Sequence, residues 1–202
     1  MKWMNTLICV KENIKGENKM NRFISDLHFG HFNIIRYDNR PFNSIKEMDE
    51  ALIENWNSVV SDNDIVYILG DISWHNEEKT VQIFQQLKGK KILIKGNHDK
   101  VAKGSNIYKC FDGVYDYYEL YLDKKNKIIM SHYPIPFWNG QFRDTIHLYG
   151  HVHNSHQWNI MENWMNELRQ LQDIPMRAYN VGCMMKWMNY TPRTLDEIIE
   201  GY

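Results

Sequence analysis

The spacing of apolar residues along the chain alternates between one that is typical of strands and one that is typical of helices. Short runs rich in Ile, Val, Leu, Phe and Tyr recur, and most of them end at Gly, Asp, Asn or His. Such runs predict short β-strands bounded by turns. The polar segment 123–126 separates two of the runs and predicts a β-hairpin. The expected strands cover residues 22–25, 64–69, 91–95, 115–122, 127–130, 145–149 and 178–183.

Helices are expected between these strands, where apolar residues recur three and four positions apart. In segment 44–60, Ser44 is followed three residues later by Glu47, which is a capping-box signature for a helix start. Further helices are expected at 76–87, at 159–172 and after Thr194. Strands and helices that alternate with short connections favour an α/β fold (α+β layered), with helices outside layered sheets.

The chain is expected to form a single domain over residues 1–202. This length suits one domain with a substantial core, and no Gly/Ser-rich linker divides it. Residues 1–19 precede the first strong strand and are expected to be an N-terminal appendage. Within it, residues 6–10 would either add an edge strand or belong to a mobile tail.

The composition excludes several classes of protein. The net charge of -1 argues against a general basic surface for duplex nucleic acid. Cys9, Cys110 and Cys183 are too scattered for a disulfide framework or a zinc ribbon, so reduced thiols and a cytoplasmic location are expected. No apolar run reaches the length of a membrane span, and the run 6–10 is too short for a signal peptide.

Side chains that can bind metals follow directly after several of the expected strands. In an extended chain, residues two apart point to the same side, so neighbouring ligands are expected to converge in pairs. Sites in open α/β sheets form beyond the carboxyl ends of the strands, which is where these residues lie. The segments are Asp26-Leu27-His28, Gly70-Asp71, Gly96-Asn97-His98-Asp99, Ser131-His132 and Gly150-His151-Val152-His153.

The donor types restrict the metal. Imidazole, carboxylate and amide oxygen without thiolate suit Mn, Fe, Ni, Zn or Co better than Ca or a cysteine-bound zinc. The candidates are too many for one ion and suit two divalent ions that share a carboxylate. With Asp26 and Asp71 as anionic ligands, such a site keeps a positive excess, which favours a phosphate group. Paired ions can polarise a phosphoryl oxygen and generate a hydroxide nucleophile.

The ordered motifs D-x-H, GD, GNHD, a lone H and GHxH resemble the calcineurin-like metallophosphoesterase superfamily. The resemblance spans residues 23–153, and Asn180-Val181-Gly182 is similar to the closing strand of that superfamily. It implies a β-sandwich flanked by helices and a hydroxide that bridges two metals. The resemblance assigns Asp26, His28 and His153 to the first metal, Asn97, His132 and His151 to the second, and Asp71 to both.

The resemblance also implies that His98 donates a proton and stabilises the transition state, with Asp99 beside it. Orientation of Asn97 is an alternative role for His98. The stretch 31–42 resembles small bacterial and phage members of the superfamily. Candidates for substrate contacts, with loop packing or solvent exposure as the alternative, are His31, Arg36, Arg40 and Arg143. Isolated residues of the same types are left unassigned, namely Asp64, His75, His147 and His156.

These observations predict a hydrolase, a metal-dependent phosphodiesterase or phosphatase for a small, nucleotide-like ester, with manganese among the candidate metals and no membrane partner. A nuclease of the same chemistry is one alternative, although the net charge disfavours it. A binding module without turnover, as the retromer subunit of the superfamily is usually regarded, is another. The retained ligands and His98 argue against it.

Residues 154–177 are expected to form a helical insertion that leaves directly from the site. Its helix could form one wall of a narrow cleft, and segment 133–143, with Trp138 and Arg143, the opposite wall. A structural cover or an oligomer contact is the alternative. The expected apolar face consists of Ile160, Met161, Trp164, Leu168 and Leu171.

Overall fold

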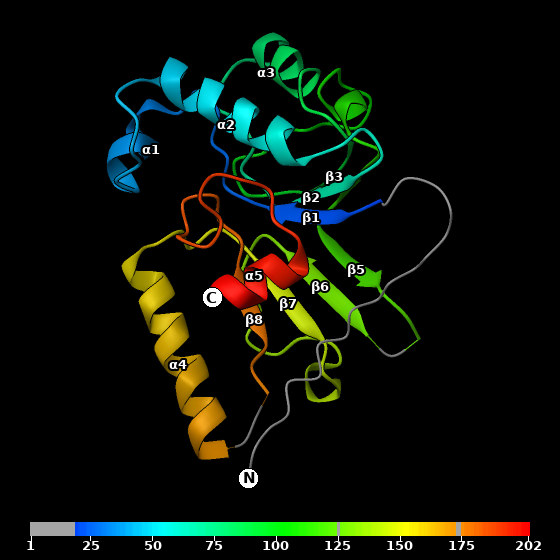
Figure 1. The fold of residues 1–202 in the computed structure, drawn as a ribbon, viewed down its shortest axis with the longest axis vertical. Helices are drawn as coiled ribbons and strands as arrows, with labels where there is room; N and C mark the ends of the chain where they lie inside the picture. Colours follow the sequence, from blue (N-terminus) through cyan, green and yellow to red (C-terminus); the bar gives the residue numbers. More distant parts are fainter. Residues whose placement is uncertain (1–18, 125, 173–174) are drawn as a thin grey trace.

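Two four-stranded sheets lie at the centre of the computed structural model, which describes residues 19–124, 126–172 and 175–202 (Figure 1). The first sheet is parallel, with the order β1 (Asn21–Ile24), β2 (Ile65–Ile68), β3 (Lys90–Ile94) and β4 (Gly113–Tyr115). In the second, β5 and β6 pair antiparallel and the later pairs are parallel. Its order is β5 (Tyr117–Tyr121), β6 (Lys127–Ser131), β7 (Ile146–Tyr149) and β8 (Ala178–Asn180). The predicted layered α/β class is confirmed.

Helices cover the outer sides of both sheets (Figure 1). Those on the side of the first sheet are α1 (Phe32–Tyr37), α2 (Ile45–Val59) and α3 (Glu77–Phe84). Those near the second sheet are α4 (His156–Gln172) and the short α5 (Leu195–Gly201), which also contacts β1. Two short 3-10 helices are η1 (Tyr108–Cys110) and η2 (Gln141–Arg143).

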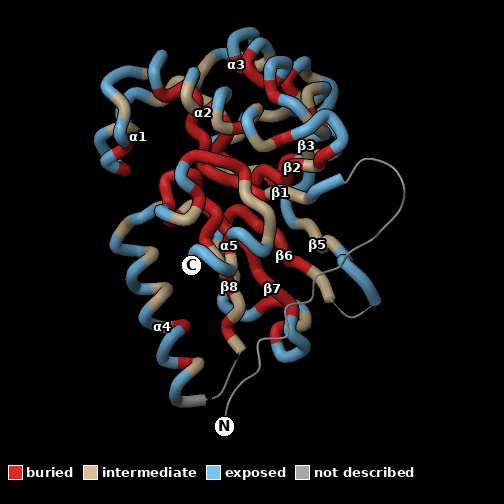
Figure 2. The backbone as a smooth tube through the Cα atoms, viewed as in Figure 1, coloured by how far each residue is buried: buried red, intermediate tan, exposed pale blue. Residues whose placement is uncertain are grey.

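One hydrophobic core lies between the two sheets. Phe23 of β1 and Ile128 and Met130 of β6 belong to it, and each is at most 1% exposed. Ile129 lies between those β6 residues in sequence but belongs to a second cluster. Because successive strand residues point to opposite faces, the second sheet is buried on both sides. Figure 2 shows these strands as buried and much of the helical surface as exposed.

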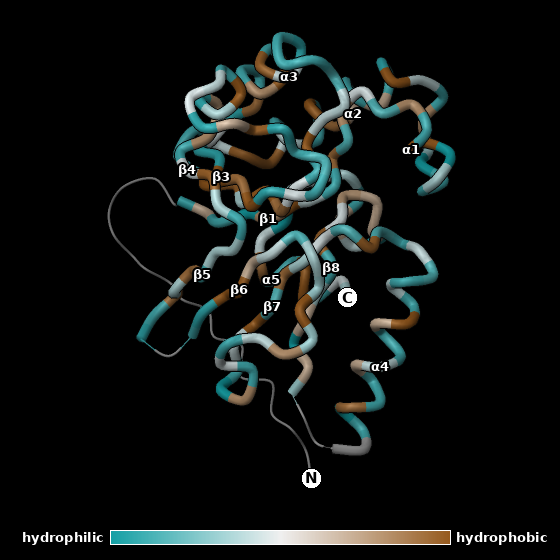
Figure 3. The backbone as a smooth tube through the Cα atoms, turned by 180° about the vertical axis from the view of Figure 1, so that it is seen from behind, coloured by the Kyte–Doolittle hydropathy of each residue, from teal (hydrophilic) through white to brown (hydrophobic). Residues whose placement is uncertain are grey.

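Helix α4 packs on the outer face of the second sheet, where Met165 and Leu168 are buried with Ile129. Ile160 was expected on the apolar face but is 56% exposed. That prediction is wrong, because the buried stripe passes through Met165 instead. Trp138, expected in a wall beside the site, is buried in the same cluster as Met165. Figure 3 shows hydrophobic and hydrophilic positions alternating along α4.

The expected strand 115–122 is divided between the two sheets. Tyr115 pairs with Ile94 of β3 in the first sheet. Tyr117 pairs with Ser131 of β6 in the second. The run of β-forming residues is continuous in sequence, so only the change of pairing partner shows where one sheet ends and the other begins.

Helices begin at both predicted capping residues, but only one of the two forms a complete capping box. Ser44 accepts a hydrogen bond from the backbone N–H of Glu47 (3.1 Å). The Glu47 carboxylate accepts from the N–H of Asn43 (2.8 Å), one residue earlier than a capping box requires. Thr194 and Glu197 form the complete reciprocal box at the start of α5.

Two other expectations concern the chain ends and membranes. The strand or tail expected at 6–10 lies outside the described residues. Within the described part of the chain, none of the helices combines the length and the apolar character that a bilayer crossing needs.

The buried His147 of β7 makes the stability of the fold depend on pH. Its Nδ1 donates to the carbonyl of Ile129 (3.2 Å), and its Nε2 accepts from the N–H of Ile135 (3.0 Å). Burial lowers the pKa of His147 from 6.5 to about 4, although the hydrogen bond to Ile129 opposes the shift. The unfolded chain therefore binds this proton at a higher pH than the folded protein. The stabilisation is complete above pH 6.5 and is lost as the pH falls to about 4.

We expect the change to be about 3 kcal/mol, because one pKa unit corresponds to about 1.4 kcal/mol. His147→Gln removes the titrating group, so its unfolding free energy should fall less between neutral pH and pH 4. Urea unfolding of metal-free protein measures the difference. His156→Gln, at an exposed position of α4, is the control and should keep the wild-type pH dependence. Identical pH dependence in wild type and His147→Gln would contradict the prediction.

Candidate metal centre

The loops that follow β1, β2, β3, β6 and β7 meet at one edge of the two sheets. Within each sheet these strands run parallel, so their carboxyl ends lie together. This is the edge at which open α/β sheets bind ligands. The structure brings onto these loops every residue that the resemblance assigns to a metal: Asp26, His28, Asp71, Asn97, His132, His151 and His153.

The ligand loops are curled rather than extended. The φ angles are 56° at Asp26, 52° at His28, 54° at Asp71, 68° at His151 and 49° at His153. Residues other than glycine rarely adopt this left-handed conformation, and backbone strain of this kind is concentrated at functional sites. The expectation of an extended chain is therefore wrong. Ligands two residues apart converge because the backbone turns at each of them.

Asp26, His28 and His153 form the first cluster, with ligand atoms that all lie within 4.8 Å of one another. Asp26 Oδ1 is 3.5 Å from His153 Nε2, and the two histidine Nε2 atoms are 3.4 Å apart. Asp26 and His28 are buried, whereas His153 is partly exposed. The geometry of this trio suits one metal ion.

His132 is at the centre of the second cluster, in which its ligand atom and those of Asp26 and Asp71 also lie within 4.8 Å. His132 Nε2 is 3.1 Å from Asn97 Oδ1. The ring of His151 lies 5.1 Å from the ring of His132. The second group assigned from the sequence is therefore also together in space.

The carboxylate of Asp71 lies between the two clusters. Its Oδ2 is 3.6 Å from His28 Nε2 on one side. Its Oδ1 is 3.6 Å from His132 Nε2 on the other. One carboxylate thus faces both groups of ligands, as a shared ligand must.

The hydrogen bonding of His132 tests whether these groups fit a cation. Its Nδ1 lies 2.7 Å from the carbonyl of Leu69, which can only accept, so Nδ1 carries the proton. In the neutral ring, Nε2 then presents a lone pair toward Asn97 Oδ1 and Asp71 Oδ1. A cation between these converging atoms would bind all three of them. The mixture of imidazole, carboxylate and amide oxygen fits a divalent transition metal.

The charges of the first cluster support the same conclusion. Burial opposes a charge on His153, but Asp26 and Asp38 raise the pKa of His153 to about 10. Burial would raise the pKa of Asp26, yet His153 and the other nearby histidines lower it well below its usual range. A metal at His153 Nε2 must therefore displace a proton, which couples metal binding to pH.

Trp74 lies against the first cluster. Burial lowers the pKa of His28 to about 2, so its ring is neutral. The indole N–H of Trp74 donates to His28 Nδ1 (3.0 Å), which leaves the ring proton on Nε2, the atom that faces the site. Metal ligation through Nε2 therefore requires this hydrogen bond to open.

Glycines allow the loops to approach one another. A Cβ atom at Gly96 would overlap the Asp71 carboxylate. A Cβ atom at Gly150 would overlap the side chain of Ser25, which itself donates to Asp26 Oδ2 (2.5 Å). Larger residues at these positions would push the ligand loops apart.

Asp38 holds His153 in place, although it is not among the site residues expected from the sequence. Asp38 Oδ1 is 2.7 Å from His153 Nδ1, and Asp38 Oδ2 accepts two hydrogen bonds from Arg40. Arg40 also donates to the carbonyls of Asp26 (2.9 Å) and Leu27 (3.0 Å). The only sequence signal for Asp38 was its place within the 31–42 stretch.

This network changes the interpretation of Arg40, which the sequence suggested as a substrate contact. Its side chain is fully buried, and all three guanidinium nitrogens donate to protein acceptors. A guanidinium with these partners connects Asp38 to the loop that carries Asp26 and so holds the ligand loops in position. We therefore correct its expected role to that of a positioning residue.

His98 and Asp99 have different surroundings. The side chain of His98 is 45% exposed, and its Nε2 is 4.0 Å from Asp71 Oδ2. The Asp99 carboxylate accepts from the N–H groups of Asp71, Ile72 and Gly96 at 2.7–2.9 Å. Burial raises the pKa of Asp99 despite these bonds. His98 is thus free to meet a substrate, whereas Asp99 joins two ligand loops.

The remaining substrate candidates are not equally near the site. His31 stacks on Trp74, with ring centres 4.2 Å apart, and so borders the first cluster. Arg36 is exposed beside Tyr37. Arg143 is exposed on η2, which precedes the amino end of β7, so the structure places it at the edge opposite the ligand loops.

The fold and the site together define a metal-binding protein of the metallophosphoesterase type. The chain belongs to the calcineurin-like phosphoesterase family, whose model matches residues 22–181. The uncharacterized protein MJ1445 of Methanocaldococcus jannaschii is 34% identical over 179 residues, 88% of each chain. The Gene 66 protein of Mycobacterium phage D29 is 28% identical, over 88% of this chain and 93% of that protein.

A solved structure also resembles this one over nearly its whole length. The protein of unknown function AQ665 from Aquifex aeolicus superposes with a TM-score of 0.67 and 28% identity. The superposition covers 91% of this chain and 99% of that one. The predicted superfamily, with small phage-type relatives, is confirmed.

The contact between Asp38 and His153 leads to a prediction about metal affinity. Asp38→Asn removes the charge that orients and polarises the ligand, and we expect affinity to fall about 10–100-fold, as for other partners of ligating histidines. Competition with a chromophoric chelator measures the change. Asp64→Asn is the control, because Asp64 is a buried carboxylate that binds the N–H groups of Met20 and Ser61 instead. Unchanged affinity in Asp38→Asn would remove Asp38 from the site.

Proposed function

We propose that this protein is a two-metal phosphodiesterase that hydrolyses small, nucleotide-like esters. The observation that supports this most directly is the place of Asp71, whose two oxygens face His28 and His132 at equal distances of 3.6 Å. A carboxylate so placed suits a pair of ions better than a single ion. Membership of a metal-dependent phosphoesterase family supports the same chemistry.

Two bound divalent ions would activate a water molecule as nucleophile and polarise the phosphoryl oxygens. The chain would hold one ion with Asp26, His28 and His153. It would hold the other with Asn97, His132 and His151. Asp71 would contact both. The donor set suits Mn, Fe, Ni, Zn or Co.

His98 is placed to act on the substrate rather than on the ions. Its exposed ring lies beside the Asp71 carboxylate, and its backbone N–H donates to Asp71 Oδ1 (3.1 Å). The backbone contact fixes the start of the side chain, while the ring can reach the leaving group. We assign it proton donation to the leaving oxygen.

Three further features support a small substrate in the cytoplasm. A cavity of about 330 Å³ opens beside Asn97 and His132, a volume in the range of small-ligand pockets. The net charge of -1 does not favour a nucleic acid strand. Cys110 and Cys183 are free thiols, as expected in a reducing compartment.

A substrate screen tests the proposal. Metal-stripped protein is loaded separately with Mn, Ni, Zn or Mg and given phosphomonoesters, cyclic and linear phosphodiesters, and pyrophosphate. We expect small diesters to be cleaved fastest, and only after metal is restored. Metal-loaded protein that cleaves none of these compounds, or chelated protein that retains full activity, would contradict the proposal.

A further inference from the structure

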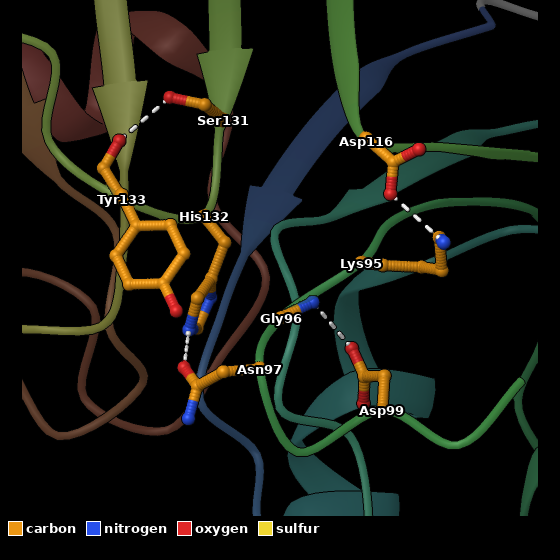
Figure 4. Close-up of a pocket in the computed structure, with 8 residues that line it drawn as sticks. All are labelled: Lys95, Gly96, Asn97, Asp99, Asp116, Ser131, His132 and Tyr133. Atoms are coloured by element: carbon orange, nitrogen blue, oxygen red, sulfur yellow. Dashed lines mark hydrogen bonds and ion pairs between the residues drawn. The ribbon is translucent and has the colours of Figure 1, made fainter.

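The cavity beside the candidate metal centre has walls from two different sheets. Lys95 and Asn97 follow β3 of the first sheet, and His132 and Tyr133 follow β6 of the second. Asp116, between β4 and β5, completes the rim. Figure 4 shows Tyr133 and His132 on one side and the Lys95–Asp116 pair on the other. A group bound here would touch residues outside the ligand set as well as the ligands themselves.

Tyr133 provides an aromatic surface at this cavity. The residue is 50% exposed, and its ring centre lies 4.4 Å from that of His151 and 5.3 Å from that of His132. Its carbonyl accepts a hydrogen bond from the Ser131 hydroxyl (2.6 Å), which holds the turn after β6 in place. The ring is therefore supported from one side by ligand histidines while much of its surface is open to a planar group.

The opposite wall combines a donor and an acceptor. Lys95 Nζ is 2.8 Å from Asp116 Oδ1, and the two side chains are 34% and 85% exposed. An ion pair this exposed is weak, so a ligand can share or displace either partner. The nearby Asp99 carboxylate is already bound by backbone N–H groups. The wall therefore suits an uncharged group that both donates and accepts hydrogen bonds, more than it suits a second phosphate.

We propose that this cavity is a nucleoside subsite. The base stacks on Tyr133, and the Lys95–Asp116 pair hydrogen-bonds to the base edge or the sugar hydroxyls. The volume of about 330 Å³ suits one nucleoside-sized group. Base–aromatic stacking gives affinity for every base, so the subsite selects nucleosides as a class. This inference rests on the proposed function, because a phosphate at the metals carries the nucleoside into the cavity.

Binding and turnover are measured separately, both with metal-loaded protein. Thymidine has no phosphate, so its binding in an NMR titration does not depend on hydrolysis. Turnover is compared for two diesters with the same leaving group, thymidine 5′-(p-nitrophenyl phosphate) and methyl p-nitrophenyl phosphate. We expect wild type to bind thymidine and to prefer the thymidine diester about tenfold or more in kcat/KM.

Matched variants assign the effect to the cavity. Tyr133→Leu should weaken thymidine binding about tenfold and abolish the preference between the diesters, while Tyr133→Phe should keep both. Lys95→Met should weaken binding about fivefold or more. Lys90→Met, at the opposite end of β3, is the control and should behave as wild type. The metal content of each variant is measured, because Tyr133 packs on His151.

The outcomes distinguish this inference from the proposed function. Hydrolysis of both diesters at equal rates, or thymidine binding that is unchanged in Tyr133→Leu and Lys95→Met, would overturn the nucleoside subsite and leave the phosphoesterase in place. Wild type that does not bind thymidine would overturn the subsite as well. Thymidine binding that depends on Tyr133, without hydrolysis of either diester, would support the subsite and contradict the phosphodiesterase.

Discussion

Asp71→Ala is expected to remove both metal ions and to lower kcat/KM by about 10³-fold or more. Metal ions contribute several kcal/mol of transition-state stabilisation, and each 1.36 kcal/mol is about a factor of ten in rate. His28 lies on one side of Asp71 and His132 on the other, so the loss of Asp71 affects both clusters, whereas the loss of His28 affects only the first. His28→Ala should therefore cost less activity than Asp71→Ala and should leave one ion bound.

Elemental analysis of purified protein, together with initial rates, measures both effects. Asp112→Ala is the control, because Asp112 binds the backbone N–H of Lys91 at the amino end of β3, the end opposite the ligand loops. It should keep the wild-type metal content. Wild type that saturates with a single ion, or Asp71→Ala that retains both, would end the two-metal interpretation.

His98→Asn is expected to lower kcat by about 10²–10⁴-fold, the usual contribution of general acid catalysis, while both ions stay bound. The reason is geometric. The His98 side chain is 45% exposed and its Nε2 lies 4.0 Å from Asp71 Oδ2. Within each cluster, the ligand atoms lie within 4.8 Å of one another without His98. Its removal should therefore change the chemistry and leave the ligand set intact.

The leaving group separates two roles of His98. If it donates a proton, an ester with a good leaving group such as p-nitrophenolate should lose much less rate than an alkyl ester. Equal losses for both esters would indicate charge stabilisation instead. His156→Asn, at an exposed position of α4, is the control and should keep wild-type rates. Wild-type rates in His98→Asn would exclude the residue from the mechanism.

The strands and the order of the motifs could be predicted from the sequence because both depend on near neighbours in the chain. Strand β2, for example, has apolar residues from Ile65 to Ile68 and ends before Gly70-Asp71, so its position follows from local hydrophobicity and turn chemistry. The helix that begins after Ser44 likewise follows from its cap and its apolar spacing. Local rules of this kind need no knowledge of the fold.

Elements whose partners are distant in sequence could not be predicted in the same way. The run 115–122 gives no sign that Tyr115 pairs with β3 and Tyr117 with β6. The buried face of α4 is chosen by the sheet it covers, so Ile160 is exposed although its spacing fits a helical stripe. Helix α1 buries one residue, Ile34, which is too little for a recognisable apolar pattern.

By itself the sequence determined which side chains could bind metal and that they follow strand ends, because ligand chemistry and strand endings are local properties. Only the tertiary structure decided how they meet. It curls the loops at Asp26 and His153 into left-handed backbone and directs Asp71 toward both clusters. It also brings Asp38 into contact with the ligand His153 and Arg40 into contact with Asp38. The contact from Asp38 to His153 joins segments more than a hundred residues apart, and such a pairing depends on the packing of the whole fold.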